Sequence, residues 1–267
     1  MIADTIIVVG DQGRVERISR HFDRIDHKVS NREFVTHTGE FNGKRLTILS
    51  TGIGTDNIDI VINELDAAIN IDLKKRTIKD KLRSLNIIRL GTSGALQADI
   101  PVDSFVVSTH GLGFDGVLHF YENDMEDDER ALRDAFNEQV QWPSTANPIY
   151  IVKGDTGLID KIGEGAHKGI TATANGFYGP QGRVLRLAAT IPDLNERMRN
   201  FSFEDQRITN FEMETSALYG LSALLGHNAC TICAIIANRF AQEYSENHHL
   251  AVDRLIEHVL QRSTMDC

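Results

Sequence analysis

Residues 86–94, with the sequence Asn-Ile-Ile-Arg-Leu-Gly-Thr-Ser-Gly, place an apolar run directly before a turn that contains two glycines. A short apolar run followed by glycine is typical of a buried β-strand, and ligands of open α/β sheets bind at the carboxyl ends of such strands. The glycines let backbone N–H groups approach a ligand, Arg89 supplies a planar cation, and Thr92 and Ser93 supply hydroxyls. The turn therefore favours an anion such as phosphate, although an arginine in this position is often a structural ion-pair partner.

Two earlier segments have a similar layout. Residues 5–9 form an apolar run that ends at Gly10, and residues 44–50 lead into the turn Thr-Gly-Ile-Gly at 51–54. Apolar residues at helical spacing follow each turn. A strand, a glycine turn and a helix together direct backbone N–H groups and a helix N-terminus at an anion.

Alternating strand and helix patterns along the chain predict an α/β fold. The 267 residues suffice for one large domain, and no repeat or linker-like boundary divides them, so we predict a single domain over 1–267. Residues 70–84 are polar and rich in lysine, and we interpret them as a solvated surface extension that continues the preceding helix. Further strands are predicted at 102–108, 148–153, 169–174 and 229–237, and further helices at 122–133, 210–225 and 249–262.

Charge and composition exclude several classes of partner. The formal net charge of −10 argues against nucleic acid, because a phosphate polymer usually needs a basic binding face. No apolar run approaches the length of a membrane span and no signal segment opens the chain, so we expect a cytoplasmic protein without a membrane partner. Cys230 and Cys233 lie in an apolar run, where residues three apart in a strand point to opposite faces, and we interpret both as core residues.

Seven short motifs follow one another along nearly the whole chain: Gly-Asp at 10–11 with Arg14, Asn-Arg-Glu-Phe at 31–34, Ser-Thr-Gly-Ile-Gly at 50–54, Arg89 with Gly-Thr-Ser-Gly at 91–94, Phe-Tyr-Gly-Pro-Gln-Gly-Arg at 177–183, Phe-Glu-Met-Glu-Thr at 211–215, and Ile-Ala-Asn-Arg at 236–239. In this order they resemble the nucleoside phosphorylases, and most closely their pyrimidine-specific branch, the uridine phosphorylases. The resemblance implies a single-domain, three-layer α/β/α sandwich around a mixed, partly barrel-like β-sheet.

The resemblance also implies phosphorolysis, in which a ribosyl group moves from a base nitrogen to phosphate through a transition state like an oxocarbenium ion. This reaction needs positioning and electrostatic stabilisation from the protein. Phosphate needs several donors, of which bidentate arginines are the strongest. The resemblance assigns phosphate to the backbone of Gly10, to Arg14, Arg89 and Thr92, and to Arg32 of a neighbouring subunit.

For the ribose, the resemblance implies contacts from Thr92, Glu212, Met213 and Glu214. A carboxylate at Glu214 can accept hydrogen bonds from both ribose hydroxyls, and its charge favours the cationic sugar of the transition state. Taken without the other motifs, Glu212 and Glu214 would instead be carboxylates that stabilise the start of a helix.

For the base, the side-chain amide of Gln181 can donate to the uracil O4 atom and accept from N3–H, because it carries both functions. Arg183 can donate to a carbonyl where negative charge develops, and Phe177 offers a ring for stacking. Purine-specific relatives carry an aspartate after the last core strand, where this chain has Ala-Asn-Arg at 237–239, so the resemblance favours a pyrimidine. The full set implied for the base is Ser93, Gly94, Phe177, Gln181, Arg183, Ile236 and Arg239.

Because Arg32 would come from another subunit, we expect at least a homodimer, and the family's ring of three dimers suggests a hexamer. The resemblance also points to a monovalent cation such as K⁺ between paired subunits, held by Glu33 and Ser50. No organic cofactor is implied. The sequence predicts a uridine phosphorylase that acts on uridine and extends to 2′-deoxyuridine or thymidine. The alternatives are a nucleoside hydrolase or purine nucleoside phosphorylase of the same fold, and a non-catalytic nucleoside-binding protein.

Overall fold

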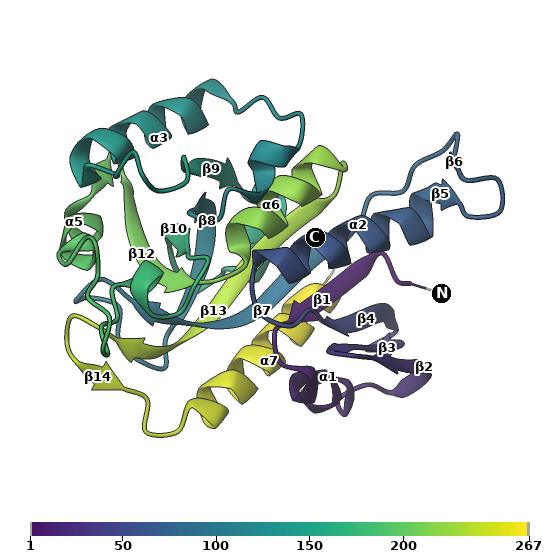
Figure 1. Cartoon of the computed structure of the whole chain (residues 1–267). Helices are drawn as coiled ribbons and strands as arrows, with labels where there is room; N and C mark the ends of the chain where they lie inside the picture. The colour runs from purple at the N-terminus through teal and green to yellow at the C-terminus, as the bar shows by residue number, and fades with distance from the viewer. Residues whose placement is uncertain (1, 266–267) are drawn as a thin grey trace.

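A twelve-stranded mixed sheet forms the centre of the computed structural model, which describes residues 2–265 (Figure 1). The strands of this sheet are β1 (Thr5–Val9), β2 (Arg24–Asn31), β3 (Phe34–Phe41), β4 (Lys44–Ser50), β7 (Asn86–Ala95), β8 (Phe105–Gly113), β9 (Tyr150–Lys153), β10 (His167–Thr173), β11 (Ser202–Phe203), β12 (Gln206–Glu212), β13 (Asn228–Asn238) and β14 (Glu243–Tyr244).

Ten of these strands follow the order β11-β12-β10-β8-β13-β7-β1-β4-β3-β2, with β9 paired to β8 and β14 paired to β13. A further pairing between β12 and β7 closes β7, β13, β8, β10 and β12 into a circuit. The strands β4, β1, β7 and β13 run parallel to one another, whereas β2, β3 and β9 pair antiparallel with their neighbours. The prediction of a mixed, partly barrel-like sheet is confirmed.

Helices cover both faces of the sheet, as the three-layer prediction requires (Figure 1). Alternate residues of β1 enter opposite cores: Ile7 packs in the cluster with α1 and α7, whereas Ile6 packs in the cluster with α2 and α6. A third cluster joins α3 and α5 to the closed circuit of strands. The helices are α1 (Gln12–Ser19), α2 (Thr55–Asn70), α3 (Asp127–Val140), α4 (Thr156–Ile162), α5 (Leu194–Asn200), α6 (Thr215–Leu224) and α7 (His248–Thr264), with short 3₁₀ helices η1 (Val117–Phe120) and η2 (Gly179–Gln181).

The prediction of a helical extension over 70–84 is wrong. α2 ends at Asn70, and a two-stranded hairpin of β5 (Ile71–Asp72) and β6 (Thr77–Ile78) projects beyond it (Figure 1). The side chain of Asn70 explains the change of direction, because it donates to the Arg83 carbonyl at 3.1 Å and accepts from the Arg83 N–H at 2.8 Å. These two bonds return the chain to the end of the helix and leave 71–82 as a surface extension.

The predicted helix over 210–225 is also partly wrong. Its first residues form the end of β12, which pairs with β10 up to Glu212, and α6 begins only at Thr215. The pairing with β10 is a long-range contact that overrides the local helical pattern. This arrangement places the motif at 211–215 across a strand end, a short connection and a helix N-terminus.

The central parallel strands are in a register that brings their carboxyl ends together. Val9 pairs with Ser50, and Val8 pairs with Arg89, so the turns after β1 and β4 lie beside the middle of β7. No helix among residues 2–265 combines the length and the apolar character that a membrane crossing demands.

Candidate active site

The turns after β1 and β4 meet at one end of the site. The backbone N–H of Thr51 donates to the Val9 carbonyl at 2.8 Å, which ties the two turns together. α1 starts at Gln12, where the carboxylate of the N-cap residue Asp11 accepts from the Gly13 N–H at 2.9 Å. Because of these contacts, the backbone of Gly10 and the first turn of α1 lie together at this end of the site.

Arg14 extends from that first turn toward β7, where its Nη1 donates to the Leu90 carbonyl at 3.2 Å. Burial lowers the pKa of Arg14, Asp11 raises it, and the positive charge of Arg89 lowers it further. Two guanidinium groups are therefore held within electrostatic reach of each other at the strand ends. A pair of like charges in such a position is favourable only when an anion shares it.

Arg89 is almost fully buried and lies between two carboxylates. Its Nη1 is 3.2 Å from a Glu212 oxygen, and its Nη2 forms a close ion pair with Glu214. Burial alone lowers the pKa of Arg89, but Glu214 and Glu212 raise it above the ordinary arginine value. Nη1 also donates to the Cys233 sulfur at 3.4 Å. Cys233 is fully buried, as expected for a core residue, and its contact with Arg89 was not predicted from the sequence.

Glu212 is held by backbone groups at the start of α6. Its carboxylate accepts from the N–H groups of Glu214 and Thr215, each at about 3.0 Å, and from the Thr173 hydroxyl at 2.7 Å. A helix N-terminus has several unpaired N–H groups, and a carboxylate satisfies them well. Glu212 therefore stabilises the helix start, in addition to pairing with Arg89.

Glu214 connects the ion pair to the turn after β4. One of its oxygens accepts from the Gly54 N–H at 2.7 Å, and the other pairs with Arg89. Burial raises the pKa of Glu214; Arg89 lowers it, and Glu212 raises it, leaving it above the ordinary value. Met213, which precedes Glu214, and Thr92, which follows Arg89 on β7, are both half-buried. The Thr92 hydroxyl makes no hydrogen bond to any residue from 2 to 265.

Gln181, Arg183 and Arg239 form the opposite end of the site. The Gln181 side-chain oxygen accepts from both arginines at 2.6 Å, and Arg239 also donates to the Gln181 backbone carbonyl at 2.5 Å. The two guanidinium groups occupy the lone pairs of this oxygen within the described chain, and the expected acceptance from the uracil N3–H stays a prediction. The amide nitrogen keeps its two hydrogens without an acceptor in the described chain.

Phe177 is covered on one face by the Arg183 guanidinium, 3.7 Å from the ring centroid. The same guanidinium donates to the Phe177 carbonyl at 2.6 Å, so the ring and the arginine are fixed together. The covered face is not open for stacking against a base. Burial lowers the pKa of Arg183 and also lowers that of Arg239, to about 10, which leaves Arg239 charged at neutral pH.

The remaining residues implied for the base lie on β7 and β13. Gly94 faces Arg239, because a Cβ atom there would be 3.4 Å from its Nε. Ser93 is buried, and its hydroxyl accepts from the Asn210 amide at 2.9 Å, so it is held inside the protein. Ile236 is half-buried, and its carbonyl accepts from the Ser245 N–H at 3.0 Å. β7 and β13 pair over their full length. The paired strands therefore connect the end of the site that contains Arg89 to the end that contains Arg239.

Arg32 lies at the exposed turn between β2 and β3 and makes no hydrogen bond or ion pair within residues 2–265. Glu33 follows it, beside Gly52. The Ser50 hydroxyl is fully buried, donates to the Glu33 carbonyl at 2.5 Å and accepts from the Val35 N–H at 2.7 Å. Ser50 thus bonds to the protein backbone, and the K⁺ site expected from Glu33 and Ser50 of paired subunits stays a prediction.

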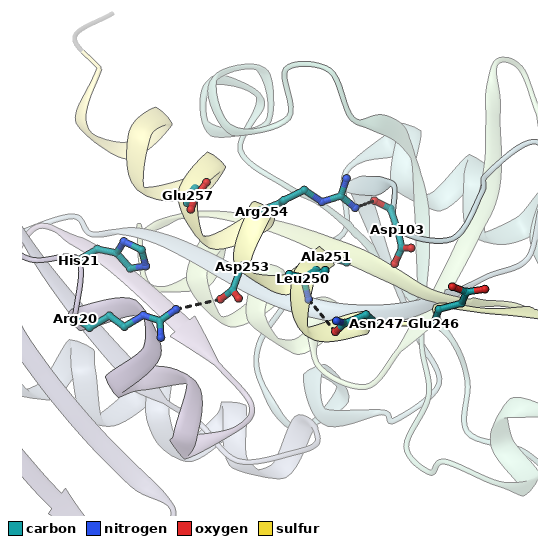
Figure 2. Close-up of a pocket in the computed structure, with 10 residues that line it drawn as sticks. All are labelled: Arg20, His21, Asp103, Glu246, Asn247, Leu250, Ala251, Asp253, Arg254 and Glu257. Atoms are coloured by element: carbon teal, nitrogen blue, oxygen red, sulfur yellow. Dashed lines mark hydrogen bonds and ion pairs between the residues drawn. The ribbon is translucent and has the colours of Figure 1, made fainter.

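A separate surface recess lies between α1 and the N-terminal half of α7 (Figure 2). Its volume is about 650 Å³, and its lining carries both signs of charge. Arg20 reaches Asp253 across it, and Arg254 donates to the Asp103 carbonyl at 3.0 Å. None of the residues predicted for phosphate, ribose or base lines this recess.

Comparison with known proteins gives the family. Residues 4–264 match the phosphorylase superfamily. The uridine phosphorylase of Thermococcus kodakarensis is 29% identical over 251 residues, covering 92% of this chain and 76% of that protein. The uridine phosphorylase of Escherichia coli (strain K12) is 30% identical over 250 residues, covering 90% of this chain and 83% of that protein. A Trypanosoma brucei nucleoside phosphorylase, whose crystal structure is described as showing uridine phosphorylase activity, has a TM-score of 0.89 and 29% identity, covering 98% of this chain and 93% of its own. The chain therefore belongs to the phosphorylase superfamily.

Proposed function

We propose that this chain is a uridine phosphorylase that converts uridine and phosphate reversibly to uracil and ribose 1-phosphate in pyrimidine salvage. The proposal rests on the pairing of β7 with β13. This pairing places the Arg89–Glu214 ion pair and the cluster around Gln181 in one site. The printed activities of the relatives from T. kodakarensis and E. coli support it. We place the enzyme in the cytoplasm, where pyrimidine salvage takes place.

We assign phosphate to the end of the site formed by Arg14 and Arg89, with the Gly10 N–H and the Thr92 hydroxyl as further donors. Within one chain, the two arginines and the two glutamates Glu212 and Glu214 carry opposite formal charges that cancel. A bound phosphate therefore needs a further cation, because a buried anion without a partner is costly.

We assign that cation to Arg32 of the partner subunit. Its place at an exposed turn, with no partner in the described chain, leaves the guanidinium free to reach another copy. The working unit is then at least a homodimer, and we propose the hexamer of three dimers as the complete assembly. Closed symmetry of this kind is the usual form of soluble homo-oligomers.

Ribose then lies between phosphate and base, with Glu214 accepting from its hydroxyls and Met213 packing beside it. As the bond from C1′ to the base nitrogen lengthens, positive charge develops on the sugar. The Glu214 carboxylate stabilises this charge because it is fixed in advance by the Gly54 N–H and by Arg89. Phosphate attacks C1′ from the Arg89 side, and the base leaves toward the opposite end.

The leaving uracil gains negative charge on its carbonyl oxygens. The free amide nitrogen of Gln181 donates to one of them, and Arg183 donates to the other through its Nη2 and Nε atoms, which make no bond to residues 2–265. A purine offers no matching pair of carbonyls in this orientation. The same contacts accept 2′-deoxyuridine and thymidine, since neither change alters the carbonyl groups.

The test is an assay of purified protein with a panel of pyrimidine and purine nucleosides, with and without phosphate. We expect cleavage of uridine that depends on phosphate and yields ribose 1-phosphate, and little cleavage of inosine or adenosine. Equal cleavage in the absence of phosphate would identify a nucleoside hydrolase instead. Uridine binding in calorimetry without turnover would identify a non-catalytic binding protein.

A further inference from the structure

Cys233 lies on β13 and pairs with Gly91 of β7. The Arg89 guanidinium lies against the same glycine. Its side chain is fully buried, and its sulfur accepts from the Arg89 Nη1 at 3.4 Å. The two glutamates that pair with Arg89 approach from β12 and the start of α6, whereas the cysteine approaches from β13. Arg89 is thus held from three directions.

Gly91 makes this arrangement possible. A Cβ atom at Gly91 would lie 2.8 Å from the Cys233 sulfur and would overlap the Arg89 guanidinium. The missing side chain leaves a space that the guanidinium and the sulfur fill together. A glycine inside a buried strand often marks such a close approach.

A thiol suits this position because it adds no charge. Burial raises the pKa of Cys233, to about 11, even though the neighbouring Arg89 lowers it, so the group is a neutral thiol at physiological pH. Glu212 and Glu214 already balance the charge of Arg89 and Arg14. A third carboxylate here would repel phosphate, whereas a neutral sulfur can orient the guanidinium without opposing the ligand.

Cys230 provides the contrast. It lies three residues earlier on the same strand, is also fully buried, and packs in the apolar cluster with Ile7 and Leu255. It makes no contact with the arginine, as expected for strand residues three apart. The two cysteines therefore share strand and burial but differ in their relation to Arg89.

From these contacts we propose that Cys233 is a positioning residue, which holds the Arg89 guanidinium so that its remaining N–H groups face the phosphate. The inference rests on the proposed phosphorylase function, because it assigns phosphate to Arg89. Without the sulfur, the guanidinium can turn further toward the glutamates. Phosphate affinity then falls, while contacts to ribose and base change little.

The experiment compares Cys233→Ala, Cys233→Ser and the matched control Cys230→Ala with the wild-type protein. Steady-state kinetics give KM for phosphate and KM for uridine separately, and the rise in melting temperature on adding inorganic phosphate measures binding without turnover. For Cys233→Ala we expect KM for phosphate to rise about 3- to 10-fold, the size of one modest hydrogen bond, with KM for uridine nearly unchanged. Cys233→Ser should restore most of the loss, because a hydroxyl can also accept from Nη1.

Cys230→Ala should lower the melting temperature without changing KM for phosphate. The inference is overturned if Cys233→Ala leaves KM for phosphate unchanged, raises both KM values equally, or if the serine variant behaves like alanine. Should the wild-type protein gain stability from phosphate but cleave no nucleoside, the proposed function fails, and the phosphate-induced shifts of the variants still decide the role of Cys233. A wild-type protein that does not respond to phosphate at all would overturn both.

Discussion

Glu212 and Glu214 are two residues apart and pair with the same arginine, yet their surroundings give them different tasks. Glu212 is surrounded by donors of the protein itself, from the start of α6 and from Thr173. Glu214 has one donor at the turn after β4 and one at Arg89, which leaves lone pairs for ribose hydroxyls. Stability should therefore depend on the first carboxylate and catalysis on the second.

Replacing each glutamate by glutamine tests this division. We expect Glu212→Gln to lower the free energy of unfolding by about 1–3 kcal/mol, because an amide N–H₂ would face N–H donors that now lack an acceptor. Glu214→Gln should keep most of the stability and lose about 100-fold or more in kcat/KM for uridine, since the charge that stabilises the sugar is gone. Urea unfolding and steady-state kinetics measure the two effects. The opposite pattern would exchange the two roles.

The Gln181 side chain carries both a hydrogen-bond acceptor and a donor, and its contacts within residues 2–265 leave only the donor free. Because its oxygen accepts from Arg183 and Arg239, we expect its nitrogen to be the group that contacts the base. In a Gln181→Glu variant the carboxylate keeps both arginine contacts but offers no donor to a uracil carbonyl. We expect an unchanged or higher melting temperature and a fall of about 100-fold or more in kcat/KM for uridine.

Stabilisation by inorganic phosphate is the internal control for this variant, because the phosphate end is not touched. Retained uridine cleavage in Gln181→Glu would show that the amide nitrogen does not contact the base. The result would then favour a base position closer to Phe177 and Arg183.

At the level of elements, the hairpin of β5 and β6 is separate from the site. It projects from the far end of α2, while the site lies at the carboxyl ends of β1, β4 and β7 (Figure 1). Its return is fixed by the two bonds between Asn70 and the backbone of Arg83. The residues between 71 and 82 include Leu73 and Ile78, both largely exposed, so they contribute little to the core.

Joining 71 to 82 through two glycines should therefore leave kcat/KM and the unfolding free energy close to the wild-type values. The two bonds between the Asn70 side chain and Arg83 remain in this variant, whereas the bond from the Lys79 N–H to the Asn70 carbonyl is lost. A short loop closes with little entropic cost. Differential scanning calorimetry and the uridine assay provide the measurement, with Asn70→Ala in the full-length chain as the control that should destabilise. A large loss of activity in the shortened chain would mean that the hairpin contributes to the assembled enzyme.

The elements also show what could be predicted from the sequence. The central strands and their glycine turns were predictable because β1, β4 and β7 are apolar runs with abrupt ends, a local signal. The hairpin at 71–78 and the strand end at 210–212 were not, because they depend on the Asn70 side chain and on pairing with β10. In the site, motifs identified Arg89, Glu214 and Arg183. The sequence does not show which atoms these side chains contact, or that Cys233 contacts Arg89, because the strands involved come together only in the folded chain.

At the level of the whole molecule, a single chain holds two arginines and two glutamates at the proposed phosphate end, and Arg32 is exposed without a hydrogen bond or ion pair to residues 2–265. If Arg32 completes a neighbouring site, each active site combines Arg14 of one chain with Arg32 of another. When one chain of a mixed dimer lacks Arg14 and the other lacks Arg32, both defects then lie in the same site, and the second site is complete.

Mixing Arg14→Ala with Arg32→Ala subunits tests this directly. Each variant alone should be nearly inactive, because every site lacks one cation. In a mixed dimer, the Arg32→Ala chain keeps its own Arg14 and receives Arg32 from the other chain, so one of the two sites is complete. Random exchange makes about half of the dimers mixed, and activity should return to about a quarter of the wild-type value. The control pairs Arg14→Ala with Glu214→Gln, two defects of residues that each chain supplies to its own site, and should stay inactive. No recovery in the test mixture would show that each site is built from one chain alone. Recovery in the control would show that Arg14 and Glu214 of one site come from different chains, and would overturn the assignment.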